Sequence, residues 1–226
     1  MKYKAIIFDL DGTVIDTEHI WRDATYEIIR RRGIIITPEI QHTLAPIMAG
    51  VGLKKGCEKL IEIFSLSDTI EAMAHEKNTL VLSMLKDRLT LMEGFIRFHA
   101  KIKELNLPIA LATNADEHTL ALVQEKLKIG EFFGEHIYYA KLVGKYKPDP
   151  AVYLHAAEKL GFKPEECIAI EDSKHGIRAA LNAKMFCIGL NSAKKIEHVQ
   201  DAHHIVHHYD EIDLEKLLEI PVPVKK

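Results

Sequence analysis

Residues 5–13 read AIIFDLDGT, and this stretch decides the fold. The first four of these residues are apolar without interruption, which is typical of a short strand buried on both faces of a parallel sheet. Asp9 and Asp11 follow directly, so the strand is expected to end in carboxylates. Gly12 comes next and frees the backbone to turn away. The sequence therefore predicts a buried first strand whose carboxyl end carries acidic side chains.

The segment that follows, residues 16–89, shows helical patterns and no convincing strand. Apolar residues recur at helical spacing from Thr17, a plausible N-cap, up to Gly33. The same spacing returns over residues 53–64 and again over residues 70–85. We therefore expect this part of the chain to be entirely helical.

After Gly94 the chain alternates between helical patterns and short apolar runs. Strands are expected at residues 109–112, 137–139, 168–170 and 186–189, with a short edge strand at residues 205–206. Such alternation predicts an α/β fold with a doubly wound parallel sheet, a Rossmann-like core. We assign residues 1–15 and 90–226 to this core, and residues 16–89 to an inserted all-helical cap.

Composition narrows the class of protein. Apolar residues make up 47% and charged residues 28% of the chain, as in a soluble globular protein. The net charge of -3 gives no reason to expect binding to nucleic acid or to an anionic membrane. Three widely spaced cysteines fit a reducing cytoplasm. Neither a secretory signal nor a membrane span is expected, and the oligomeric state stays open.

Polar side chains cluster in the sequence just beyond the expected strands, where ligands bind in an open parallel sheet. Besides Asp9 and Asp11, they are Thr113, Asn114, Lys147, Glu171 and Asp172. The four carboxylates would repel one another unless a cation neutralised them. Oxygen ligands without Cys or His favour Mg²⁺, whose remaining positions are filled by water and phosphate oxygens. Thr113, Asn114 and Lys147 are then expected to bind phosphate.

These positions resemble, in order and spacing, the four motifs of the haloacid dehalogenase-like hydrolase superfamily. The motifs are DLDGT at residues 9–13, Thr113, Lys147 with Pro148, and EDS at residues 171–173. The helical segment is similar to the cap that this superfamily inserts after its first strand. The resemblance spans essentially the whole chain.

The resemblance implies a role for each acidic residue. Asp9 would attack phosphorus to give an aspartyl-phosphate, while Asp11 would protonate the leaving alcohol and later activate water. Mg²⁺ would be held by Asp9, the backbone carbonyl of Asp11, and Asp172, with Glu171 next to it. The dehalogenases of the superfamily lack an acid at the position of Asp11, so its presence favours phosphoryl transfer.

The leading interpretation is a Mg²⁺-dependent phosphatase acting on a small phosphorylated metabolite: a sugar, polyol or nucleoside phosphate. One alternative is a phosphomutase similar to β-phosphoglucomutase, but such chains carry a histidine where Trp21 stands here, and His19 lies two residues earlier. Another alternative is a non-catalytic binding or regulatory protein. Every motif residue is present, so the sequence does not favour this alternative.

Substrate specificity is expected to come from the cap. The candidates are Trp21 together with Lys54 and Lys55, which lie in a flexible basic stretch with Gly50 and Gly52.

Overall fold

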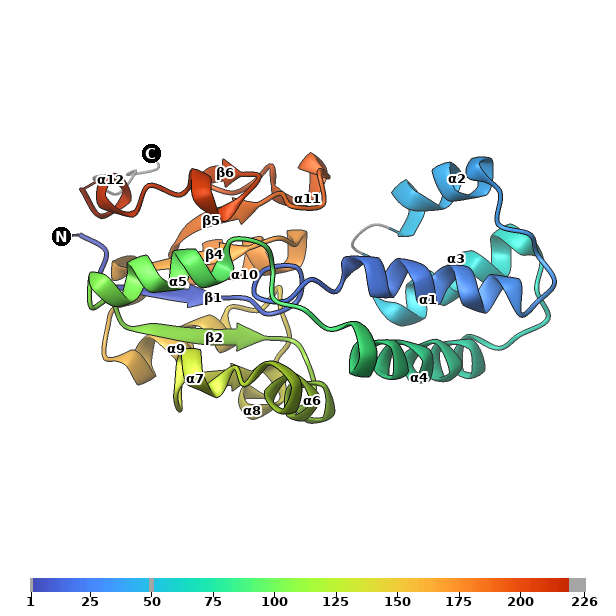
Figure 1. Ribbon diagram of the computed structural model, residues 1–226, viewed down its shortest axis with the longest axis horizontal. Coiled ribbons are helices and arrows are strands. Elements are labelled where there is room, and N and C mark those ends of the chain that lie inside the picture. The colour runs from blue at the N-terminus through green and yellow to red at the C-terminus, as the bar shows by residue number, and fades with distance from the viewer. Residues whose placement is uncertain (1, 49–50, 220–226) are drawn as a thin grey trace. The chain divides into compact units, whose positions relative to one another are not determined.

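The computed structural model describes residues 2–48 and 51–219, so Gly50 lies outside the described part. The chain divides into two compact units. One unit, residues Met1–Asp16 and Thr90–Lys226, contains the sheet, and the other, Thr17–Leu89, is helical (Figure 1).

Six parallel strands form one sheet in the order β3-β2-β1-β4-β5-β6. They are β1 (Ala5–Phe8), β2 (Ile109–Thr113), β3 (Ile137–Tyr139), β4 (Cys167–Glu171), β5 (Phe186–Leu190) and β6 (His204–Val206). The doubly wound parallel sheet is confirmed, and the expected strands differ from the observed ones by at most one residue at an end. Strand β1 lies between β2 and β4, so the first acidic motif reaches the middle of the sheet's carboxyl edge.

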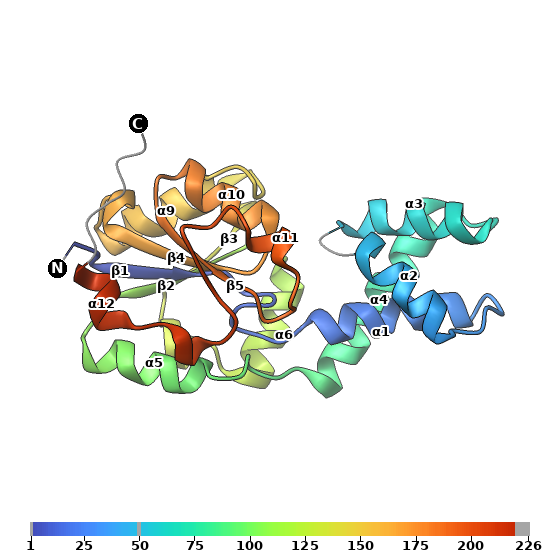
Figure 2. The same cartoon turned by 90° about the horizontal axis from the view of Figure 1, so that it is seen from above.

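Helices cover both faces of the sheet, as the view from above shows (Figure 2). Helices α9 (Ala151–Leu160) and α10 (Lys174–Asn182) lie over one face, where Ile7 of β1 belongs to their apolar cluster. Helix α5 (Phe95–Glu104) lies on the other face, where the ring of Phe8 contacts those of Phe95 and Phe98. Successive residues of a strand point to opposite faces, so an uninterrupted apolar run suits this doubly covered position.

The remaining helices of this unit are mostly short. They are α6 (Glu117–Leu127), α7 (Gly130–Phe133), α8 (Ala140–Val143), α11 (Ile196–Val199) and α12 (Leu214–Glu219), with 3₁₀ turns at Pro164–Glu166 and Tyr209–Glu211. Helix α6 agrees with the alternation of helical patterns and strands that the sequence predicts after Gly94. The one-turn helices α7, α8 and α11 were not expected, because four residues are too few to display a helical period.

The helical unit consists of α1 (Glu18–Arg30), α2 (Pro38–Met48), α3 (Leu53–Phe64) and α4 (Ile70–Arg88). Its core includes Ile28, Cys57 and Met73. The described residues of this unit contain no strand, as the sequence predicted. Helix α2 was not recognised from the sequence because its apolar pattern is weak: Leu44 is its one buried residue, and Pro46 lies inside it.

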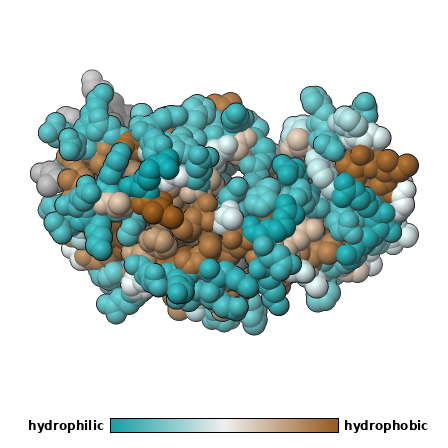
Figure 3. All heavy atoms as spheres, in the orientation of Figure 1, coloured by the Kyte–Doolittle hydropathy of each residue, from teal (hydrophilic) through white to brown (hydrophobic). Residues whose placement is uncertain are grey.

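The visible surface of both units is mostly polar, with apolar residues gathered in limited patches (Figure 3). Within residues 2–48 and 51–219, no helix is both long and apolar enough to cross a membrane.

Candidate active site

The turn after β1 presents Asp9 and Asp11 at the carboxyl edge of the sheet. The N–H of Asp9 still donates to the Ile170 carbonyl at 3.0 Å, so this residue is fixed by strand β4. Gly12 then adopts φ +77°, and a Cβ there would fall 2.0 Å from an Asp172 carboxylate oxygen. A glycine is therefore required both for the backbone turn and for the close approach of Asp172.

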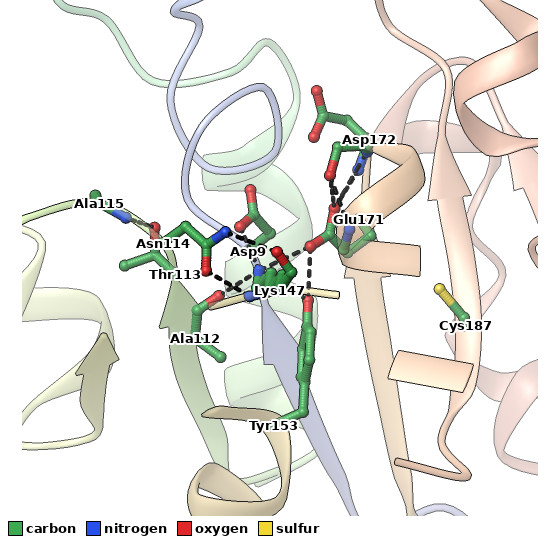
Figure 4. A network of polar contacts seen from close by, with 12 residues as sticks. Asp9, Ala112, Thr113, Asn114, Ala115, Lys147, Tyr153, Glu171, Asp172 and Cys187 are labelled. Atoms are coloured by element: carbon green, nitrogen blue, oxygen red, sulfur yellow. Dashed lines mark hydrogen bonds and ion pairs between the residues drawn. The ribbon is translucent and has the colours of Figure 1, made fainter. Parts of the chain in front are cut away.

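Lys147 is buried at the centre of the site (Figure 4). Its Nζ lies 2.5 Å from Asp9 Oδ1 and 2.7 Å from Glu171 Oε1, and it donates to the Ala112 carbonyl at 2.8 Å. Burial alone would lower the pKa of Lys147, but Asp9 and Glu171 outweigh it and raise this pKa above its usual value. The ammonium group therefore stays charged and is shared between two carboxylates.

Glu171 is fully buried at the end of β4 and accepts hydrogen bonds at both oxygens. Lys147 Nζ and the Tyr153 hydroxyl donate to Oε1, the latter at 2.9 Å. Oε2 accepts from the N–H of Asp172 at 3.1 Å, and from the N–H and hydroxyl of Ser173 at 3.2 and 3.1 Å. The predicted site residues of β1, the Lys147 loop and β4 are thus brought into one network.

Asp9, Glu171 and Asp172 each offer a carboxylate oxygen, and these atoms lie within 4.8 Å of one another. Burial, followed by the charge of Glu171, raises the pKa of Asp9 from its ordinary 3.8 to about 8, although Lys147 opposes the shift. Burial, then Asp9 and Glu171, also raises the pKa of Asp172 well above its ordinary value. One ammonium does not balance these carboxylates, so the oxygen-only cluster fits a hard divalent cation.

Thr113 and Asn114 follow β2 at the same edge. The buried Thr113 hydroxyl accepts from the Ala115 N–H at 2.9 Å, which leaves its own hydrogen to be donated. The Asn114 side chain instead contacts the backbone of Lys147 on both sides. Asn114 Oδ1 accepts from the Lys147 N–H at 2.9 Å, and Asn114 Nδ2 lies 3.4 Å from the Lys147 carbonyl oxygen. Asn114 thus holds Lys147 in place, and phosphate binding by either residue stays a prediction.

The substrate-specificity candidates all lie in the helical unit. Lys54 is 4.0 Å from Glu71, Lys55 is paired with Glu58, and both lysine side chains are exposed. Trp21 on α1 is half-buried.

Lys77 of α4 was missed by the sequence analysis. It is only 4% exposed, its Nζ lies 5.9 Å from the centre of the Trp21 ring, and no carboxylate among the described residues pairs with it. Burial lowers its pKa. A sequence signal did exist, because Lys77 interrupts the apolar series Met73, Val81 and Leu85, whose members are spaced by multiples of four.

Tyr153 and Gly176 were also missed. Tyr153 reads in the sequence as an ordinary core residue of α9, and nothing in the pattern separates it from one. A Cβ at Gly176 would lie 1.6 Å from Glu171 Oε1, so this glycine lets the α10 backbone pass close to the carboxylate. The nearby Cys187 thiol keeps its proton, because burial raises its pKa well above the ordinary value.

Comparison with known proteins gives a consistent set of relatives. Residues 3–184 match the model of the haloacid dehalogenase-like hydrolase family. A phosphorylated carbohydrates phosphatase of Thermotoga maritima is 29% identical over 184 residues, which are 80% of this chain and 81% of the relative. A β-phosphoglucomutase of Bacillus subtilis is 30% identical over 84% of both chains.

A solved structure with high similarity is a hydrolase of family IA, variant 3, from Entamoeba histolytica. It has a TM-score of 0.78 and 28% identity, over 95% of this chain and 97% of that one. The similarity therefore extends over nearly the whole chain. The sequence comparison and the fold comparison both identify haloacid dehalogenase-like hydrolases.

Proposed function

The chain belongs to the haloacid dehalogenase-like hydrolase family, and from this premise we propose that it is a Mg²⁺-dependent phosphatase for a small sugar or polyol phosphate. The observation that carries the proposal is the single buried network in which the Asp9 carboxylate is bound to Lys147 beside Glu171 and Asp172. The phosphatase and phosphomutase relatives act on phosphorylated carbohydrates according to their names, which supports this class of substrate.

In the first step the Asp9 carboxylate attacks phosphorus, and an aspartyl-phosphate forms as the bond to the substrate's alcohol oxygen breaks. The electron pair leaves with that oxygen, which takes a proton from Asp11. In the second step Asp11 takes a proton from water, whose oxygen attacks phosphorus. The bond to Asp9 breaks, so inorganic phosphate leaves and both carboxyl groups return to their starting states.

The fixed side chains supply the electrostatic part of this reaction. Lys147 is held toward Asp9, so its charge is already in place for the transferring phosphoryl group. The free hydrogen of the Thr113 hydroxyl can be donated to a phosphoryl oxygen. Asp9, Asp172 and the backbone carbonyl of Asp11 would hold Mg²⁺, with Glu171 next to it. When bound, Mg²⁺ favours the ionised form of Asp9 and neutralises charge on the phosphoryl oxygens.

The helical unit is proposed to act as the cap that selects the alcohol part of the substrate. The unpaired ammonium of Lys77 beside the Trp21 ring would suit a hydroxyl-rich or anionic group, since the ammonium donates hydrogen bonds and the ring packs on C–H groups. Lys54 and Lys55 stay additional predictions for this role.

A cytoplasmic location is part of the same proposal. The three cysteines, Cys57, Cys167 and Cys187, are free and buried, which suits a reducing compartment.

Phosphoglucomutase activity is a second candidate, favoured by the Bacillus subtilis relative. A mutase must return the phosphoryl group to a sugar hydroxyl, and Trp21 has no basic group that could take the proton of that hydroxyl. Incubation with glucose phosphates, following free phosphate and isomeric sugar phosphates together, separates the two activities. We expect stoichiometric phosphate release. Isomerisation with little free phosphate would establish the mutase and direct attention to His19 or Lys54.

The direct test compares the wild-type enzyme with Asp9→Asn and Thr113→Ala on p-nitrophenyl phosphate and on a panel of phosphorylated metabolites. Asp9→Asn should lose turnover, whereas Thr113→Ala should lose roughly 10² to 10³-fold, the cost of one transition-state donor. EDTA should abolish activity, and Mg²⁺ rather than Zn²⁺ should restore it. Near-normal kcat in Asp9→Asn would end the covalent mechanism.

A further inference from the structure

Glu171 is held by hydrogen bonds at both of its carboxylate oxygens. Its carboxylate accepts from five donors: Lys147 Nζ and the Tyr153 hydroxyl at Oε1, and the Asp172 N–H with the N–H and hydroxyl of Ser173 at Oε2. A carboxylate offers about four lone-pair sites, so these donors form a dense set. Glu171 therefore fixes the positions of its neighbours.

Helix α10 closes the remaining side of Glu171. The place of a Cβ on Gly176 would be 1.6 Å from Oε1 and 2.2 Å from Oε2. The carboxylate thus lies directly against the helix backbone and is 0% exposed. Because it cannot shift toward the helix or toward solvent, its position is set by its donors.

Lys147 depends on the same arrangement. Its three ammonium hydrogens are matched by three close acceptors: Asp9 Oδ1, Glu171 Oε1 and the Ala112 carbonyl. The oxygen of Tyr153 lies 3.3 Å from Nζ, and the centre of its ring lies 4.7 Å away. The Tyr153 oxygen is thus a fourth, more distant acceptor for Lys147, and Tyr153 faces the ammonium with the lone pair and π-electrons that favour a cation.

Tyr153 is a rigid donor to this pair. It is 0% exposed within the apolar cluster under α9, and its hydroxyl reaches Glu171 at 2.9 Å (Figure 4). Burial, together with the charges of Glu171 and Asp9, raises the pKa of Tyr153 well above its ordinary value, so the phenol keeps its proton. The phenol therefore remains a hydrogen-bond donor throughout the physiological pH range.

We propose that Tyr153 is a positioning residue for phosphoryl transfer: by sharing Glu171 Oε1 with Lys147, it keeps the ammonium of Lys147 directed at Asp9. This assignment rests on the proposed phosphatase function. Without the hydroxyl, Glu171 Oε1 would keep Lys147 as its single donor and would draw the ammonium away from Asp9. The loss would appear mainly in kcat, because the charge of Lys147 acts most strongly on the transferring phosphoryl group.

The test compares Tyr153→Phe with Tyr138→Phe on p-nitrophenyl phosphate at saturating Mg²⁺. Tyr138 is a matched control, because it belongs to the same apolar cluster and its hydroxyl bonds His136 Nδ1 at 3.0 Å, outside the network. Tyr153→Phe should lower kcat about tenfold with KM changed less than about twofold, as for one hydrogen bond to a charged group. Tyr138→Phe should keep wild-type kcat. Equal kcat values for the two variants would overturn the proposal.

A double-mutant cycle with Glu171→Gln distinguishes positioning through Glu171 from a general structural role. In the Glu171→Gln background, Tyr153→Phe should cost less than about threefold, because the shared charge is already gone. The same tenfold loss in both backgrounds would contradict the proposal. Should Tyr153→Phe not fold, Tyr153→Met removes the hydroxyl and fills part of the space with a flexible side chain, and it is expected to show the same pattern.

Urea-unfolding midpoints measure the same coupling independently of activity. The four proteins compared are the wild type, Tyr153→Phe, Glu171→Gln and the double variant. The midpoints should be non-additive, and additive midpoints would overturn the positioning claim. A wild-type protein without phosphatase activity would instead overturn the proposed function, so the two failures are distinguishable.

Discussion

Each of the two units of the molecule buries a lysine, but only one of the two lysines is paired with carboxylates. Lys147 in the α/β unit is 7% exposed and has two carboxylates and a carbonyl within hydrogen-bond distance. Lys77 in the helical unit is 4% exposed, and no carboxylate in the described part of the chain pairs with it. Partners raise the pKa of Lys147, whereas burial lowers that of Lys77.

The difference between the two lysines fits the roles proposed for the two units. Burial disfavours the charged form of Lys77, so we expect this residue to reduce the stability of the helical unit. The charge of Lys147 is instead held in place by its acceptors, as its proposed electrostatic role requires. On the proposed function, the α/β unit carries the reacting groups, and the helical unit carries a polar group for selecting the substrate.

Of the changes that probe this comparison, removing the charge of Lys147 is expected to have the largest effect on kcat. Lys147→Met should lower kcat by roughly 10³-fold, because both the nucleophile and the phosphoryl group lose their fixed cation. It should also destabilise the metal-free protein by about 3–5 kcal/mol, since buried carboxylates lose their partner. Steady-state kinetics and urea unfolding measure the two effects. A variant with wild-type kcat would place Lys147 outside the reaction.

A smaller effect is expected when the stability of the protein is measured at different pH values with and without Mg²⁺. The pKa of Asp9 is raised from 3.8 to about 8, so the metal-free folded protein holds a proton that the unfolded chain has lost between these values. Stability should therefore fall as the pH rises from about 4 to about 8. The raised pKa of Lys147 acts only at more alkaline pH.

Because Mg²⁺ competes with the proton on Asp9, the gain in Tm on adding Mg²⁺ to EDTA-treated protein should be larger near pH 8 than near pH 5. Thermal unfolding at the two pH values, with and without Mg²⁺, checks this expectation. An equal gain at both pH values would show that the cation does not bind at Asp9.

The smallest effect concerns the unpaired lysine. Lys77→Met should stabilise the protein by about 1–2 kcal/mol, because it replaces an uncompensated buried charge with an apolar side chain of similar length. Since the folded pKa of Lys77 is lowered, wild-type stability rises with pH toward the ordinary value of 10.5, and the gain should shrink accordingly. Urea unfolding near pH 6 and near pH 9 measures it.

The same variant should raise KM for sugar phosphates if Lys77 contacts the substrate. Lys86→Met is the control, since Lys86 lies on the same helix and is exposed. If Lys77→Met is less stable than the wild type at both pH values, the expectation that Lys77 reduces stability would be contradicted.

The sequence predicted the sheet because its strands are buried on both faces and so appear as uninterrupted apolar runs, as at residues 5–8. Asp9, Lys147 and Glu171 could be found because parallel strands deliver their following residues to one edge. Asn114 was expected to bind phosphate, but its contacts with the Lys147 backbone depend on a loop conformation that spacing does not reveal.

Tyr153 and Gly176 escaped prediction for a similar reason. Their importance comes from a distance to Glu171 that arises only when α9 and α10 pack on the sheet. Lys77 could have been found, because a lysine in an apolar series of a helix is unusual.

The most direct test of the central claim is to detect the phosphoryl group on Asp9. In Asp11→Asn, p-nitrophenyl phosphate should still transfer its phosphoryl group, because its leaving group needs no proton, but the variant cannot activate water. Peptide mass spectrometry after acid quenching should then find phosphate on the peptide containing Asp9, and none in the Asp9→Asn/Asp11→Asn double variant. Phosphate on a different residue, or turnover by wild-type enzyme with no phosphorylated Asp11→Asn protein, would contradict the account.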